Sequence, residues 1–116
     1  TDNTLSFTQG GSVVATANSN AITSTGVWTY VTVVRTGSTG DWTITFYVND
    51  SAHGSTSSIS TNPDSTVDNT RIGSRGDISG LHFNGVIDDL TVYDATALTA
   101  NQVARNYKAG KRRHRS

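Results

Sequence analysis

Two adjacent carboxylates, Asp88 and Asp89, are the residues of this chain whose type and position most clearly suggest chemistry. They lie between Ile87 and Leu90 in a run that has the composition of a β-strand, residues 85–93. In a strand, Asp88 would share a face with Leu90, which is typical of a core position. A buried carboxylate needs N–H donors, an arginine or a cation, because an unpaired buried charge is too unfavourable. The residues alone leave these alternatives open.

Catalysis is disfavoured by the acids that the chain contains. All nine acidic residues are Asp, and there is no Glu and no Cys. Glycoside hydrolysis needs two carboxylates about 5–10 Å apart that flank one bond, whereas Asp88 and Asp89 would point to opposite faces of a strand. His53 and His82 fall in predicted loops, without a recognisable Ser–His–Asp arrangement. We therefore expect a protein that is not an enzyme.

Ligand binding is predicted instead at residues in or beside loops. Glycan sites combine aromatic rings with polar side chains, and the candidates are Trp42, Arg75, His82 and Asn84. Arg75 also begins an Arg-Gly-Asp triplet, residues 75–77, which suggests adhesion but arises readily by chance. Four other aromatic side chains are expected to pack in the core: Trp28, Phe46, Phe83 and Tyr93.

Charge divides the chain into an acidic body and a basic end. Residues 1–104 carry three Arg against nine Asp, a net charge of −6, and residues 105–116 carry six basic residues, +6. We expect a flexible basic tail at residues 111–116, with Lys111, Arg112, Arg113 and Arg115 as candidate partner contacts. The alternatives are a solvated tail, a nonspecific phosphate contact, docking on an acidic neighbour such as the body of another copy, and a basic cleavage site. Specific nucleic-acid recognition is not expected, because no aromatic residues are interleaved with these charges.

Short runs of alternating residues predict an all-β domain over residues 1–110. Strands are expected at 4–8, 12–17, 27–35 and 42–49, with weaker ones at 55–60, 69–75 and 85–93. The best alternation places Trp42, Ile44, Phe46 and Val48 on one face, and the preceding turn joins 27–35 and 42–49 in a hairpin. Seven or so short, closely spaced strands are typical of a β-sandwich. No apolar run is long enough to insert into a membrane.

A single helix is predicted at the end of this domain. Thr99 and Gln102 form the T-x-x-Q pattern of a capping box, and Gly110 is suited to the position that ends a helix. Val103 and Tyr107, one turn apart, would dock the helix on the sandwich.

The last third of the sequence resembles the C-terminal pattern of laminin-G-like, concanavalin A-like domains. The matching residues are Ile72-Gly73, then Phe83-x-Gly85-x-Ile87-Asp88-Asp89-Leu90-x-Val92-Tyr93, then Leu98 before a short helix. Upstream, "GVWTYVTVVRTG" and "WTITFYVND" resemble two further strands of the family. Asp50 stands where the family usually has Gly, and the N-terminal strands of the family are short or absent here.

The resemblance implies a jelly-roll antiparallel β-sandwich with a short C-terminal helix. It also implies a structural calcium ion at Asp88; the alternative is that Asp88 accepts hydrogen bonds from neighbouring backbone or hydroxyl groups. The expected function is a non-enzymatic binding or adhesion module on an extracellular or virus-particle surface, with a glycan or protein partner. The alternatives are a structural subunit that assembles with other chains and, less favoured without Glu, a fragment of a glucanase.

Overall fold

The structure is a computed structural model that describes residues 3–9, 12–63, 71–74 and 82–114. Five strands and one helix are present in this part of the chain. The strands are β1 (Ser6–Gln9), β2 (Ser12–Thr16), β3 (Val31–Ser38), β4 (Asp41–Val48) and β5 (Ser51–Ile59), and the helix is α1 (Ala100–Lys111).

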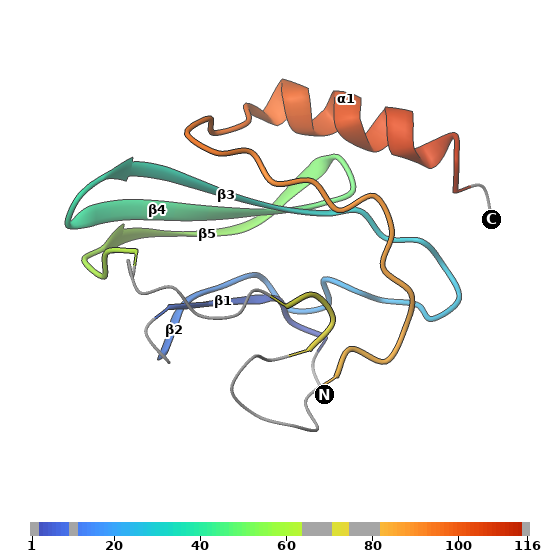
Figure 1. Cartoon of the computed structure of the whole chain (residues 1–116), viewed down its shortest axis with the longest axis horizontal. Helices are drawn as coiled ribbons and strands as arrows, with labels where there is room; N and C mark the ends of the chain where they lie inside the picture. The colour runs from blue at the N-terminus through green and yellow to red at the C-terminus, as the bar shows by residue number, and fades with distance from the viewer. Residues whose placement is uncertain (1–2, 10–11, 64–70, 75–81, 115–116) are drawn as a thin grey trace.

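These elements form three layers (Figure 1). The antiparallel hairpin β1–β2 covers one face of an antiparallel sheet of order β3-β4-β5, and α1 lies on the opposite face. The hairpin is held to the sheet at β5, where the Asn18 N–H donates to the His53 carbonyl at 2.9 Å. The fold is thus mostly β, with two antiparallel sheets and a short C-terminal helix, which confirms the predicted β-sandwich class.

The core lies between β4 and the hairpin, as the alternation of β4 predicts. Ile44 and Phe46 are almost completely buried there, and Ala15, Ala17 and Ile59 close the cluster. Burial of Phe46 alone removes a large apolar side chain from water, which stabilises the fold by about 1.5–3 kcal/mol. The small residues Ala15 and Ala17 allow the hairpin backbone to approach the sheet closely.

The helix begins as the sequence predicts and ends later. The Thr99 hydroxyl accepts the Gln102 N–H, and the Gln102 side chain accepts the Thr99 N–H at 2.8 Å, so the capping box is confirmed. Gly110 does not end the helix, which continues to Lys111 and is capped by Arg112. Val103 is buried, and Tyr107 lies beside Tyr30 with ring centroids 6.2 Å apart. In the described part of the chain, α1 is too short and too polar to cross a membrane.

The predicted strand at residues 85–93 is not formed. The segment has no strand pairing, and Leu90 and Val92 are exposed, so the expectation that Asp88 shares a buried face with them is wrong. The physical reason lies partly in the backbone at Asp89, which has a φ of +54°. The Asp88 carboxylate accepts the Asp89 N–H at 2.8 Å and so stabilises this left-handed turn instead of a strand.

Other boundaries shift by a few residues. Residues 27–30 precede β3 instead of belonging to it, because the Tyr30 N–H donates to the Asn49 side chain and the Tyr30 carbonyl accepts the Asn49 N–H. β5 begins at Ser51, four residues before the predicted strand. The strand expected at 69–75 lies largely outside the described residues; Ser74 forms an isolated antiparallel bridge with His82.

Candidate functional site

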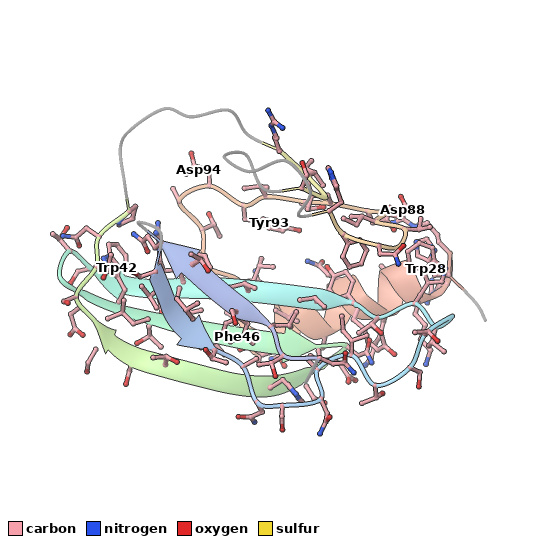
Figure 2. All side chains as sticks on the ribbon, turned by 90° about the horizontal axis from the view of Figure 1, so that it is seen from below. Trp28, Trp42, Phe46, Asp88, Tyr93 and Asp94 are labelled. Carbon is pink, nitrogen blue, oxygen red and sulfur yellow. The ribbon has the colours of Figure 1, made fainter. Side chains whose placement is uncertain are left out.

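Three of the four aromatic residues expected in the core are exposed. Phe46 is buried, but Trp28, Phe83 and Tyr93 expose 42%, 54% and 48% of their surface. Trp28 lies in the loop before β3, Phe83 just before the segment that fails to form a strand, and Tyr93 within it. Figure 2 shows Trp28 and Tyr93 on the same side of the molecule. The prediction of core packing is wrong for these residues, because the sheet that would cover them is not present among the described elements.

These rings line an open groove. We call β3 its floor and the segment from Phe83 to Leu98 its opposite wall. Leu5 and Phe7, at the start of the hairpin, also line it, as do residues at the end of α1 and just after it: Tyr107, Gly110, Lys111 and His114. Figure 2 shows the opposite wall running beside β3, with Tyr93 and Asp94 toward one end and Asp88 and Trp28 at the other. The groove is therefore mainly apolar, with its acidic side chains along one wall.

A polar cluster closes the end of the groove near Trp28. His114 Nε2 lies 3.2 Å from Asp88 Oδ2 and 3.2 Å from Asp89 Oδ2. Arg113 donates to Asp89 Oδ1, also at 3.2 Å. The imidazole of His114 packs against the indole of Trp28, with ring centroids 4.3 Å apart. The residues just after α1 thus fold back onto the Asp88–Asp89 turn and connect it to the aromatic groove.

The donor set at Asp88 does not match a typical calcium site. The candidate metal ligands that the described residues bring together are Asp88, Asp89 and His114, with ligand atoms within 4.8 Å of one another. Calcium prefers six to eight oxygen ligands, whereas this group includes an imidazole nitrogen and a carboxylate already bound by Arg113. The Asp88–Asp89 backbone contact is of the kind that the hydrogen-bond alternative predicts. Calcium at Asp88 remains an untested prediction, and Asp88 is exposed rather than buried, with 55% of its side chain accessible.

The ligand-binding residues predicted from the sequence do not form one cluster in the described structure. Trp42 is half-buried against the core; its Nε1–H donates to Asn62 at 2.9 Å, and the Arg35 guanidinium lies 4.8 Å from its ring centroid. His82 and Asn84 are exposed and, unlike Trp42, do not line the groove. Arg75 and the Arg-Gly-Asp triplet lie outside the described residues.

The basic tail is partly integrated into the fold. Lys111 is the last residue of α1, with its ammonium group 5.7 Å from the ring centroid of Tyr107. Arg112 caps the helix and Arg113 binds Asp89. Arg115 lies outside the described residues. The segment predicted as a flexible tail therefore begins inside the helix and contacts the body of the protein as far as His114.

Sequence reasoning missed Trp28 and His114 as site residues. Residue type alone predicts that Trp28 is in the core, because aromatic residues are usually buried. His114 stands 25 positions from Asp89, in a basic run with no local motif. The one signal available was the opposite charge of the two regions, which predicts attraction between them without naming the histidine.

The fold is that of a β-sandwich, and the comparison with protein families gives its superfamily. The model of the Laminin_G_3 family, within the concanavalin A-like lectin/glucanase superfamily, matches residues 1–104. Because this match covers most of the chain, the protein belongs to that family.

One solved structure is similar over most of the chain. It is the crystal structure of an S-layer domain-containing protein from Clostridium thermocellum, which is 23% identical with a TM-score of 0.51. The alignment covers 90% of the present chain and 50% of the solved one, so this chain spans about half the length of that structure. The likeness supports the fold. No curated protein sequence matches the chain significantly.

Proposed function

We propose that the protein is a non-enzymatic binding module of an extracellular surface, and that it recognises a carbohydrate at the end of the groove. The observation that carries this proposal is the combination of the exposed Trp28 indole with the carboxylates of Asp88 and Asp89 beside it. An aromatic face packs on the apolar C–H groups of a sugar ring, while carboxylates accept hydrogen bonds from its hydroxyl groups. Membership of a lectin/glucanase superfamily supports this ligand class.

The polar residues of the cluster hold each other in position. Arg113 and His114 contact Asp89 from the end of α1, and His114 also contacts Asp88. Pre-formed contacts of this kind reduce the entropy lost when a ligand binds. The name of the similar Clostridium thermocellum protein, an S-layer domain-containing protein, supports a location on a surface outside the cell. The absence of Glu supports a role in binding rather than in glycoside hydrolysis.

A glycan array probed with the purified chain tests this proposal. Asp88→Asn should reduce binding to any retained glycan about 10-fold or more, since a hydrogen bond to a charged group contributes about 1.5–3 kcal/mol. Trp28→Ala should reduce it by a similar factor, because it removes the aromatic face that packs on the sugar ring. Asp41→Asn is a matched control, because Asp41 is exposed at the start of β4 and does not line the groove. Asn84→Ala tests whether the residue predicted from the sequence contributes.

Melting curves of each variant separate lost binding from lost folding. If no glycan is retained, or if Trp28→Ala binds as well as the unaltered chain, carbohydrate binding at this site is wrong.

A structural subunit is the second candidate function. It is favoured by a different observation, the exposed apolar side chains that extend along β3 and the opposite wall of the groove. Surfaces of this kind mark contacts with other polypeptides.

A further inference from the structure

The outer edge of β3 is unpaired among the described residues. β3 pairs with β4 alone, so its other side presents N–H and C=O groups without strand partners. Val33 lies opposite Phe46 in the ladder and Val31 opposite Val48, so both face the hairpin side of the sheet. The hairpin packs toward β5 and leaves Val31 and Val33 exposed. Natural proteins usually cover such an edge.

The opposite wall of the groove also lacks a pairing partner among the described residues. Val86, Ile87, Leu90 and Val92 are all exposed, and the backbone of residues 86–93 has no backbone hydrogen bond to another described segment. This wall runs in the same direction as β3 (Figure 1). An extended chain that lay between them in the opposite direction would be antiparallel to both. The groove thus has the backbone groups and apolar side chains that a further strand needs.

The surface area of the chain is large for its mass. A compact monomer of 12.3 kDa exposes about 6,100 Å². This chain exposes 8466 Å², about 2,400 Å² more than that expectation. A standard protein interface buries about 800 Å² on each partner, and obligate dimers bury more. The excess is a total for the whole chain, and it is larger than the area that one partner buries in a standard interface.

We propose that the groove is the interface of a two-fold homodimer. In this dimer, residues 86–93 of each copy lie in the groove of the other copy and run antiparallel to that copy's β3 and to that copy's residues 86–93. The left-handed turn at Asp89 interrupts this contact on each copy. A two-fold axis requires that one surface carry both complementary features. This groove does so, because an apolar wall and an open apolar floor lie side by side in every copy.

Charge also favours a second copy as the occupant. Arg35, on the same face of β3 as Val33, is exposed and contacts the Trp42 ring. Asp94 lines the opposite wall together with Asp88 and Asp89, which also contact Arg113 and His114 of their own copy. The dimer brings this wall of one copy toward the Arg35 side of the other. A membrane with anionic headgroups would be repelled by these carboxylates, and a lipid would leave the backbone groups of β3 unpaired.

The native mass of the purified chain, measured over a wide range of protein concentration, tests the dimer. We expect twice 12.3 kDa at high concentration and dissociation on dilution. Val92→Lys and Val33→Lys should each weaken association at least about 10-fold, because a lysine would be buried without a partner. Val13→Lys is the matched control: Val13 is 60% exposed on β2 but does not line the groove, whereas Val92 is 83% exposed within it. Dimerisation of the Val13→Lys variant should be unchanged.

Hydrogen exchange of the unaltered chain gives a second readout that needs no variant. Backbone amides of β3 and residues 86–93 should gain protection as concentration rises, whereas those of β2 should not. A monomer at every concentration, equal effects of Val13→Lys and Val92→Lys, or protection without this pattern would each overturn the proposal. Residues 86–93 include Asp88, so the dimer would cover part of the proposed glycan site. The glycan array is therefore probed at a concentration where the native mass is that of the monomer, and the two proposals can then fail independently.

Discussion

Apolar residues on one face of the sheet are buried on β4 but exposed on the neighbouring strand β3. On β4, Ile44 and Phe46 are covered by the hairpin and become the best-buried side chains of the sheet. One strand away, Val31 and Val33 point to the same side of the sheet but are exposed. The difference lies in the covering layer and not in the strand. We call the first region the closed side and the region of β3 and residues 86–93 the open side.

Stability should therefore reside mainly on the closed side. Phe46→Ala should lower the free energy of unfolding by about 3–5 kcal/mol, because it leaves a cavity in the packed cluster. Phe83→Ala, on the open side, should lower it by about 1 kcal/mol or less, since Phe83 is more than half exposed. Urea denaturation at a concentration where the protein is monomeric measures both.

Comparable losses for the two variants would mean that the open side is packed as tightly as the closed side. If Phe46→Ala does not fold, Phe46→Leu keeps most of the volume and allows the same comparison.

The close contact between hairpin and sheet gives a second test of the closed side. A Cβ at Gly54, φ +112°, would lie 2.7 Å from the Asn18 nitrogen and 3.1 Å from the Ala17 Cα. Gly26 also has a positive φ, +75°, but a Cβ there would meet nothing within 4 Å. Gly54→Ala should cost about 2–4 kcal/mol through strain and steric overlap, and Gly26→Ala about 1 kcal/mol through strain alone.

Thermal and urea unfolding of these two alanine variants separate backbone strain from crowding. Equal losses would show that the hairpin can move away from β5 without loss of stability, and that the closed side is held less firmly than its burial implies.

Local sequence patterns were sufficient for the closed side. Alternation predicts the buried face of β4, and the turn between Ser38 and Asp41 fits the register of its hairpin with β3. The capping box at Thr99 is also local, since its two residues are three positions apart. In each case the interactions that decide the structure lie within a few residues or in the adjacent strand.

The open side could not be predicted in the same way, because its structure depends on distant partners. Residues 85–93 have strand composition, but a strand needs a neighbour to pair with, and the turn at Asp89 is stabilised by contacts from Arg113 and His114. Residue type alone predicts that Trp28, Phe83 and Tyr93 are in the core. Burial is a property of the layers that meet, and here one layer is missing from the described structure.

The capping box of α1 is expected to contribute less to the free energy of unfolding than the packing at Phe46 or Gly54. Thr99→Ala removes the hydroxyl that accepts the Gln102 N–H and should lower the free energy of unfolding by about 1 kcal/mol. Thr96→Ala, at an exposed position just before the helix, should change it by less than about 0.5 kcal/mol. Circular dichroism during urea denaturation reports both. If the two variants are equally stable, α1 is held mainly by Val103 and Tyr107.

The smallest effect is expected for the ion pair on the open side. Arg113→Ala removes the contact with Asp89, but 67% of the arginine side chain is exposed, so water and salt screen the attraction. The free energy of unfolding should fall by no more than about 0.5 kcal/mol, and the loss should shrink further in high salt. Urea denaturation at low and high ionic strength measures both quantities. A loss that is large and independent of salt would show that Arg113 fixes the turn at Asp89 by packing and geometry, and that the open side is more rigid than its exposure indicates.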